Sequence, residues 1–212
     1  MSSAKHNILK KIRQALATPV PAPFPHHENA ENFFQPSQQD LEIEFAENFT
    51  KLLGKFSFCA DTKELSEQLN ILAKSRNWTK IFCREPEIKH DLHTNGFSNF
   101  EAADVHTCEA SITDCELLIA RTGSILMTTG QRSGRTTSVY APVHICIAYT
   151  DQLVYDIKDG IDFLKRKYRD NIPSFITLAT GPSRTADIEK TLVVGVHGPK
   201  EVFCFLVERN AS

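Results

Sequence analysis

The fold of this chain is decided by one segment of its C-terminal half, which reads Phe175-Ile176-Thr177-Leu178-Ala179-Thr180-Gly181-Pro182-Ser183-Arg184-Thr185-Ala186-Asp187-Ile188-Glu189. Its first five residues are apolar and β-branched enough to predict a buried strand. Gly181 tolerates backbone angles that are closed to other residues, and Pro182 fixes its own φ. Because Ser183 or Thr185 can cap a first helical turn, the segment predicts a strand, a tight loop and a helix in succession.

The start of that expected helix has the chemistry of an anion site. Free N–H groups and the helix dipole attract negative charge, and Arg184 adds a planar, bidentate donor. A phosphate or a carboxylate is the expected ligand. The alternative is structural, with Ser183 as a cap only and Arg184 paired with Asp187 or Glu189. The segment by itself leaves both interpretations open.

Elsewhere, apolar strand-like runs alternate with helical patterns. We expect helices over residues 40–53, from the capping box that starts at Asp61, and over 155–169. We expect strands over 56–60, 80–83, 100–105, 117–120 and 143–149, and a hairpin-like stretch over 124–128. This alternation predicts an α/β fold with a mostly parallel sheet flanked by helices. Open sheets of this kind bind ligands beyond the carboxyl ends of their strands.

A second motif follows the first after a short apolar run, and it reads Gly195-Val196-His197-Gly198-Pro199. Together the two motifs resemble the signature of the LUD-domain family, in particular its lactate-utilisation members. Residues 120–126 and 142–145 also fit this family, so that the resemblance covers roughly residues 105 to 207. Arg121 is a departure, because family members usually carry a glutamate there, and a role tied to that acid does not transfer.

The resemblance implies a NagB/RpiA/CoA transferase-like fold, which is shared by ribose-5-phosphate isomerase, glucosamine-6-phosphate deaminase and CoA transferases. It also implies a part in converting L-lactate to pyruvate, together with partner proteins that carry iron-sulfur clusters. The chain itself shows no Gly-x-Gly-x-x-Gly fingerprint, no flavin motif and no cluster-binding cysteines, so we expect no cofactor on it.

Two alternatives stay open. The same fold permits a stand-alone enzyme that acts on a sugar phosphate or a CoA thioester, with Glu189 or Glu116 as its nucleophile. A pure assembly protein, in which the motif only stabilises turns, is the other.

The candidate site follows from the motifs. His197 is the expected proton-transfer residue, because histidine titrates near neutrality, and Asp187 is the second catalytic candidate. His144 is a further proton-transfer candidate or a hydrogen-bonded core residue. The guest would be lactate, pyruvate or a phosphorylated compound. The expected ligand-binding residues are Thr122, Gly123, Arg135, Gly181, Ser183, Arg184, Thr185 and Gly198.

Arg135 belongs to the polar loop over residues 130–138, which carries two arginines and four hydroxyls. This loop would close over an anion held at Gly181, each desolvated charged hydrogen bond adding ~1.5 to 3 kcal/mol. A simple mobile connection is the alternative.

Composition bounds the remaining possibilities. With 212 residues and 41% hydrophobic content, the chain can bury one substantial core. A net charge of -2 argues against a nucleic-acid partner. The sequence shows neither a membrane-spanning run nor a signal peptide, so a cytoplasmic protein without a transmembrane segment is expected. The six cysteines form no Cys-x-x-Cys pair and are expected to be buried free thiols rather than metal ligands.

The N-terminal region differs from the rest of the chain. Residues 1–17 predict an amphipathic helix with Ile8, Leu9, Ile12 and Leu16 on one face. Alternate prolines then favour an extended linker over residues 18–39. The LUD domain is expected to span residues 40–212. The helix docks either on that domain or on a membrane or partner.

Overall fold

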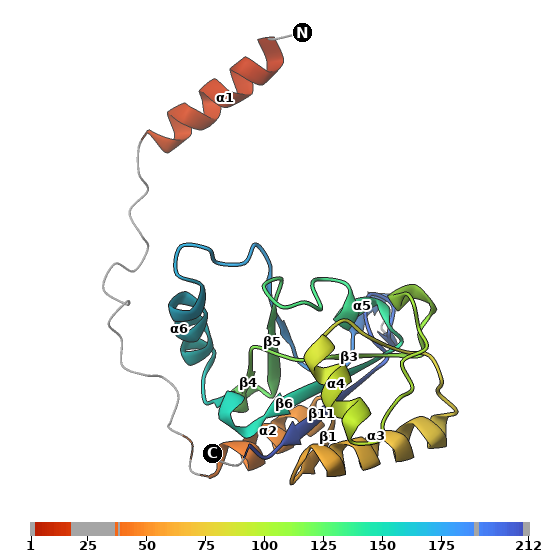
Figure 1. Ribbon diagram of the computed structural model, residues 1–212. Coiled ribbons are helices and arrows are strands. Elements are labelled where there is room, and N and C mark those ends of the chain that lie inside the picture. Colours follow the sequence, from red (N-terminus) through yellow and green to blue (C-terminus); the bar gives the residue numbers. More distant parts are fainter. Residues whose placement is uncertain (1–2, 18–36, 38, 189–190, 210–212) are drawn as a thin grey trace. The chain divides into compact units, whose positions relative to one another are not determined.

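The computed structural model describes residues 3–17, 37, 39–188 and 191–209 (Figure 1). The chain divides into two units, Met1–Pro36 and Ser37–Ser212. In the first unit, α1 spans Ser3–Leu16, as its apolar periodicity predicts. The expected linker over residues 18–39 lies almost wholly outside the described residues.

The second unit is built on a five-stranded sheet in which every pair of neighbours is parallel. Its strands, in spatial order, are β1 (Lys55–Cys59), β11 (Glu201–Val207), β6 (Val143–Tyr149), β3 (Ala110–Thr113) and β2 (Ile81–Cys83). The prediction of an α/β fold with a mostly parallel sheet is therefore confirmed.

Both faces of this central sheet are buried, because successive residues of a strand point to opposite sides. Ile145 and Ile147 of β6 belong to a core that α3 (Thr62–Arg76) and α4 (Pro86–Thr94) cover. Cys146 and Ala148 belong to a second core, which α2 (Leu41–Lys51) covers with two phenylalanines. Because β6 is buried on both faces, nearly all of its residues are apolar.

A second, mixed sheet closes the other side of that second core. It contains, in spatial order, β7 (Leu153–Val154), β4 (Leu117–Ile119), β5 (Ser124–Thr128) and β8 (Ile176–Ala179). Figure 1 shows α6 (Ile157–Tyr168) beside β4 and β5, and Leu164 of α6 packs on Leu126.

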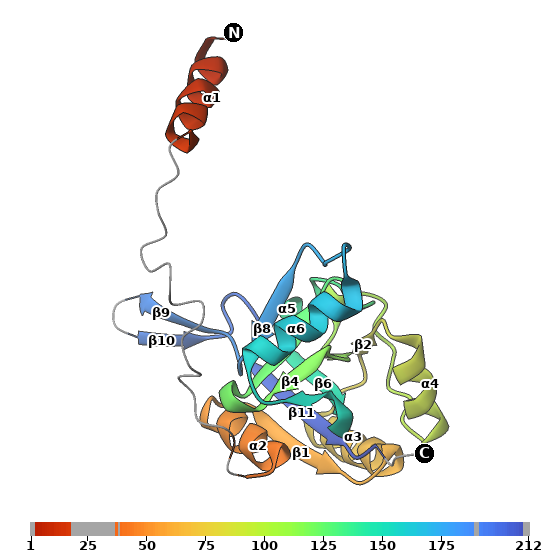
Figure 2. The same ribbon diagram turned by 90° about the vertical axis from the view of Figure 1, so that its left-hand side faces the viewer.

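The remaining elements connect these layers. Figure 2 shows the antiparallel hairpin of β9 and β10 pointing away from both sheets. These elements are β9 (Arg184–Ile188), β10 (Thr191–Val194), the short helix α5 (Thr137–Tyr140) and the 3-10 turns η2 (Val105–Thr107), η3 (Ala120–Thr122) and η4 (Thr150–Gln152).

Several expectations need correction. Residues 100–105 form no strand, because Phe100 makes only an isolated bridge to Lys80 and the sheet position is taken by β3. The expected helix after Ser183 is the strand β9. The strand after Phe175 is not buried, since β8 pairs only with β5 and its Ile176 and Leu178 are each 37% exposed.

Helix capping agrees with expectation at one helix and differs at another. Asp61 accepts a 2.7 Å hydrogen bond from the amide of Glu64 and so caps α3. Asp40 stands at the N-cap of α2, but its side chain makes no capping hydrogen bond. Within the described parts of the chain, no helix is both long and apolar enough to cross a membrane.

Candidate functional site

The two motifs lie against each other and form a loop pair, residues 180–183 and 195–199. The Ser183 amide donates to the Pro199 carbonyl, and the Gly195 amide donates to the Ser183 carbonyl, each at 2.9 Å. A Cβ added at Gly198 would lie 2.9 Å from the Ser183 Cβ. Because β11 begins at Glu201, this loop pair lies at the amino ends of the central strands.

Gly181 and Gly123 have a packing role. Gly181 has φ +78°, and a Cβ there would lie 2.3 Å from the Leu52 carbonyl oxygen at the end of α2. Gly123 has φ +58°, and a Cβ there would lie 2.4 Å from the backbone nitrogen of Phe49. Only glycine combines these backbone angles with such close approach. The two residues thus hold their turns against α2.

Hydroxyl groups join the turn around Gly123 to the loop pair. The Ser124 hydroxyl lies 2.8 Å from the Thr122 hydroxyl and 2.8 Å from the Thr180 hydroxyl. Ser124 is buried, so this row is part of the packing between β5 and the start of the Gly181 loop.

Arg184 and Thr185 lie in a strand and not at the start of the expected helix. Both residues lie in β9, where Arg184 pairs with Val194 and Thr185 with Val193. Neighbouring residues of a strand point to opposite faces, so the two side chains do not converge on one anion. The helix-dipole argument for an anion site is therefore wrong. The side chain of Asp187 lies outside the described residues.

His197 and Arg135 lie in separate places. His197 is exposed in the turn between β10 and β11. The Arg135 guanidinium donates to the Ser174 hydroxyl at 2.9 Å and lies 5.3 Å from the centre of the Phe175 ring. Arg135 therefore contacts the segment that leads into β8, whereas Gly181 follows the other end of that strand.

His144 is a core residue. It is 1% exposed, and its Nε2 lies 2.8 Å from the Thr113 hydroxyl. Burial lowers the pKa of His144 to about 4. The ring is neutral at physiological pH and has no solvent-facing side, which favours the structural alternative for this residue.

Arg121, the departure from the family pattern, forms an ion pair. Its Nε donates to an Asp156 carboxylate oxygen at 2.6 Å, and this hydrogen bond lowers the pKa of Asp156. The positive charge is thus matched by an acid at the start of α6.

A different group of side chains gathers at the opposite edge of the central sheet. There a pocket of about 380 Å³ lies beyond the carboxyl ends of β2, β3, β6 and β11. We call it the carboxyl-end pocket. It is lined by Glu85, Glu87, Ile88, Asp91, Asp114, Tyr149, Gln152 and Arg209.

Two acids from adjacent strands meet in this pocket. Glu85, which follows β2, is 3% exposed, and Asp114 follows β3 directly. The Gln131 amide donates to Asp114 at 2.5 Å. Burial, together with the charge and the hydrogen bond of Glu85, raises the pKa of Asp114 to about 7. Asp114 thus exchanges its proton near neutrality, beside the Glu85 carboxyl group.

Three other residues of the lining are held in place by hydrogen bonds or a ring contact. The Gln152 amide donates to the Cys115 carbonyl at 2.8 Å, and its oxygen accepts from the Tyr149 amide at 2.8 Å. The Arg209 guanidinium lies 4.4 Å from the centre of the Tyr149 ring and donates to Asp151 at 2.9 Å. The pocket therefore has a polar rim around the buried Glu85 and the half-buried Asp114.

Sequence reasoning missed both Glu85 and Asp114. The strand β3 was not expected at Ala110–Thr113, so Asp114 was not recognised as a residue that follows a buried parallel strand. The general rule for open sheets points to this edge and, with β3 placed correctly, would have marked both acids.

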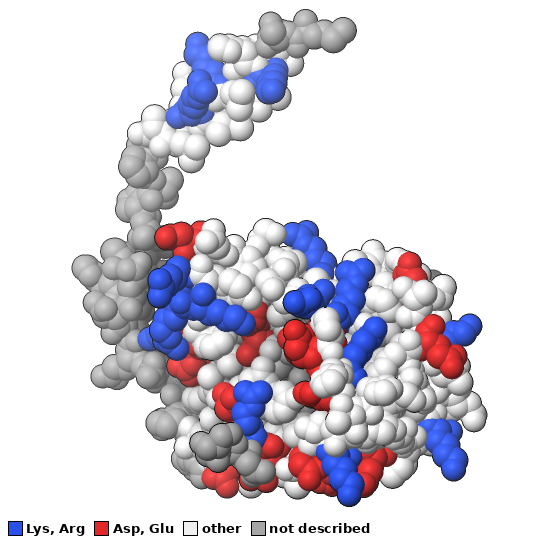
Figure 3. Space-filling view, viewed as in Figure 1, with Lys and Arg blue, Asp and Glu red and all other residues white. Residues whose placement is uncertain are grey.

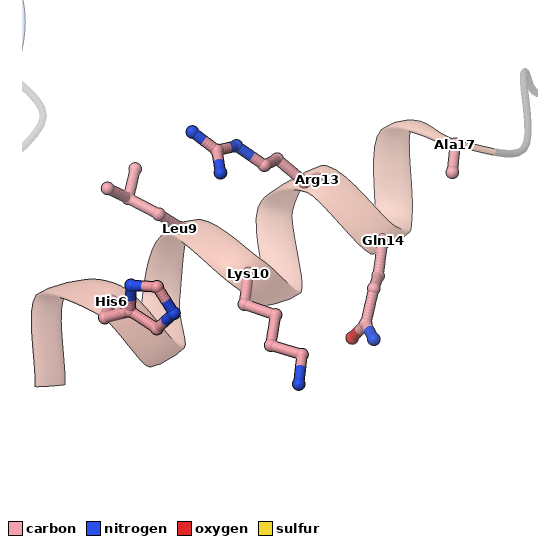
Figure 4. Close-up of a pocket in the computed structure, with 6 residues that line it drawn as sticks. All are labelled: His6, Leu9, Lys10, Arg13, Gln14 and Ala17. Carbon is pink, nitrogen blue, oxygen red and sulfur yellow. The ribbon is translucent and has the colours of Figure 1, made fainter. Parts of the chain in front are cut away.

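The charge distribution and a hollow along α1 give no further site. On the face shown in Figure 3, Lys and Arg side chains are interspersed with Asp and Glu among the described residues. Figure 4 shows a hollow lined by six residues of the α1 segment, among them His6, Lys10 and Arg13. Because all of its walls come from one helix, this hollow encloses no ligand.

The geometry defines an α/β protein with a buried parallel sheet and a polar pocket at the carboxyl ends of its strands. The LUD domain model matches residues 43–207, and the chain belongs to the LUD domain family.

Named relatives support the same family. The chain is 25% identical over 223 residues to Lactate utilization protein C of Deinococcus radiodurans, and this match covers 97% of this chain and 96% of that protein. It is 35% identical over 114 residues to the protein of the same name from Bacillus velezensis. That match covers 53% of this chain and only 46% of the relative.

A solved structure shares the fold. It is described as a crystal structure of a DUF162 family protein from Deinococcus radiodurans, and it superposes with a TM-score of 0.56 at 19% sequence identity. The superposition covers 82% of this chain and 99% of that one. At this identity, the likeness concerns the fold alone.

Proposed function

We propose that this chain is the LUD-domain subunit of a lactate-utilisation system, in which L-lactate is oxidised to pyruvate and partner proteins with iron-sulfur clusters carry the electrons. One observation carries the proposal, the alignment over 97% of this chain and 96% of the Deinococcus radiodurans Lactate utilization protein C. The LUD domain match over residues 43–207 supports it.

The state of the cysteines supports the placement of the electron carriers in partners. All six are free and buried. Burial raises the pKa of Cys59 and of Cys83 to about 12, and that of Cys108 to about 11. Cluster and metal ligands are thiolates, and these three thiols stay protonated at neutral pH. We propose a reducing, cytoplasmic setting, which keeps such thiols free.

Within this proposal, Arg184 and His197 present donors to a small anion such as lactate, pyruvate or a phosphorylated compound. His197 is exposed within the loop pair, and Arg184 is exposed directly after its first segment. An exposed charge pair contributes only about 0 to 1 kcal/mol, too little to hold a small anion. We therefore propose that a partner protein covers this surface and completes the site.

Purification from cells grown on L-lactate tests the proposal. The tagged full-length chain is expected to recover iron-sulfur proteins, and the recovered complex to reduce a dye in the presence of L-lactate. Cells that lack the chain should lose growth on L-lactate but not on glucose. Normal lactate growth of these cells would contradict the proposal.

The structure argues against Glu116, one of the two candidate nucleophiles of the alternative, a stand-alone enzyme. The Glu116 side chain is 0% exposed. Its oxygens accept hydrogen bonds from Thr128, Tyr168 and Lys167 at 2.6 to 2.7 Å. A carboxylate held in this way cannot attack a thioester. Glu189 lies outside the described residues. Turnover of a CoA thioester or sugar phosphate by the isolated chain would restore this alternative.

A further inference from the structure

In the carboxyl-end pocket, only one of the two oxygens of the Glu85 carboxylate accepts hydrogen bonds from the described residues. Glu85 Oε2 accepts from the Arg84 amide at 3.2 Å and from the Cys83 thiol at 3.5 Å. Glu85 Oε1 is buried and meets no N–H or O–H donor among the described residues. The neighbouring Asp114 can donate to Glu85 only while it carries a proton.

Ionisation of Asp114 therefore leaves two adjacent carboxylates with an unfilled acceptor. This arrangement, with Glu85 buried and Asp114 half-buried, is costly unless a donor or a positive charge enters. The other residues that line the pocket do not provide an uncommitted positive charge. Glu87 and Asp91 are further acids, and Arg209 already donates to Asp151 at 2.9 Å.

An occupant that suits this pocket brings N–H donors and a positive charge together. A neutral hydroxyl supplies the donor but leaves the negative charge uncompensated, and an anion such as lactate is repelled. A divalent metal fits less well, because among the described residues no group of three or more His, Cys, Asp or Glu is placed to bind one. An ammonium group meets both needs.

We propose that the carboxyl-end pocket binds a small ligand through an aliphatic ammonium group, which donates to Glu85 Oε1 and pairs with Asp114. Ile88 and the Tyr149 ring line the same pocket and offer apolar surface to the carbon chain of the ligand. This site is independent of the role in lactate utilisation, and neither proposal requires the other.

Binding of the ammonium group is coupled to release of a proton, because both compete for the same pair of carboxylates. The charged groups that face Asp114 are Glu85, Glu87, Asp91, Glu116 and Arg209. With Asp114 titrating at about 7, the ionised pair is scarce at pH 5.5 and dominant at pH 8. If only the ionised pair binds, affinity rises about 30-fold between these pH values.

Calorimetry on the full-length protein tests this inference, with 1,4-diaminobutane as the probe. We expect millimolar or tighter binding at pH 8, about 30-fold weaker binding at pH 5.5, and about one proton released near pH 6.5, measured in two buffers of different ionisation enthalpy. Glycerol, L-lactate and Mg²⁺ are the comparison ligands, and each is expected to bind more weakly.

Variants locate the binding. Glu85→Gln and Asp114→Asn are each expected to weaken diamine binding about tenfold or more, and Asp114→Asn also to abolish the pH dependence. The exposed Asp170→Asn is the matched control and should bind as the wild type does. Circular dichroism reports whether each variant folds, and the wild-type pH series decides even where one does not.

Three results would overturn the inference: no diamine binding at millimolar concentration, equal binding of glycerol or Mg²⁺, or unchanged binding by Glu85→Gln. None of these bears on growth with L-lactate, so failure here is distinguishable from failure of the proposed function.

Discussion

The loop pair and the carboxyl-end pocket lie at opposite edges of one parallel sheet and differ in what their residues do. At the loop pair, glycines permit close backbone contact, and Arg184 and His197 are exposed. In the pocket, no motif marks the residues, yet Glu85 is buried and the pKa of Asp114 is raised. The loop-pair motif thus sets the backbone packing. The raised pKa of Asp114 occurs instead at the ends of β2 and β3, where the sequence carries no motif.

The largest expected effect tests the packing role of the loop pair. Gly181→Ala places a Cβ 2.3 Å from the Leu52 carbonyl oxygen at φ +78°. We expect it to lower the free energy of unfolding by about 3 to 5 kcal/mol in urea titration. Gly96→Ala is the control, because φ is +87° there but nothing lies within 4 Å. That control should cost only about 1 kcal/mol, and equal losses would refute a packing role.

The acid pair in the pocket is expected to give a large pH effect. The pKa of Asp114 is about 7 in the folded protein, against an ordinary value of 3.8 for a solvated aspartate. Between these values the native state binds a proton that the unfolded state has lost, so stability falls as pH rises from about 4 to 7. Relative to Asp114→Asn, the wild type should lose about 3 kcal/mol across this range. Parallel urea titrations of the two proteins measure the difference, and a constant difference would exclude the raised pKa of Asp114.

His144 should show the opposite dependence. Its pKa is about 4 in the folded protein, against an ordinary value of 6.5 for a solvated histidine. The unfolded state therefore takes up a proton first, and stability is lost as pH falls from about 6.5 to 4. The loss should be about 2 to 3 kcal/mol relative to His144→Gln. Thermal unfolding over this pH range checks it, and a flat difference would mean that the ring is solvated.

The smallest expected effect on stability comes from the exposed arginine of β9. Arg184→Ala should change the free energy of unfolding by less than about 0.5 kcal/mol, because its side chain is exposed. The same variant should recover less iron-sulfur partner from cells grown on L-lactate. Lys165→Ala, also exposed, is the matched control. Undiminished partner recovery by Arg184→Ala would remove this residue from the proposed surface.

Local patterns predicted much of the fold. The strand over residues 143–149 was expected with the same bounds as β6, and the capping residue Asp61 starts α3 as predicted. These elements are specified by periodicity and by side-chain hydrogen bonds within a few residues. The strand β9 was misread as a helix, because glycine, proline and serine suit the start of either element.

The candidate site was less predictable than the fold. Glycines 123 and 181 were expected to meet a ligand, but each meets the backbone near the end of α2. The pairing of Glu85 with Asp114 depends on β2 and β3 being neighbours in the sheet. No local pattern encodes such a long-range pairing, since the strands are brought together by burial of both sheet faces.

By itself, the sequence determined that this chain folds as an α/β protein of the LUD domain family, because apolar periodicity and the motifs at 180–189 and 195–199 are local properties. Only the tertiary structure decided which side chains meet. Parallel strands align their carboxyl ends at one edge, and this alignment joined Glu85 to Asp114 and left the motif at the other edge.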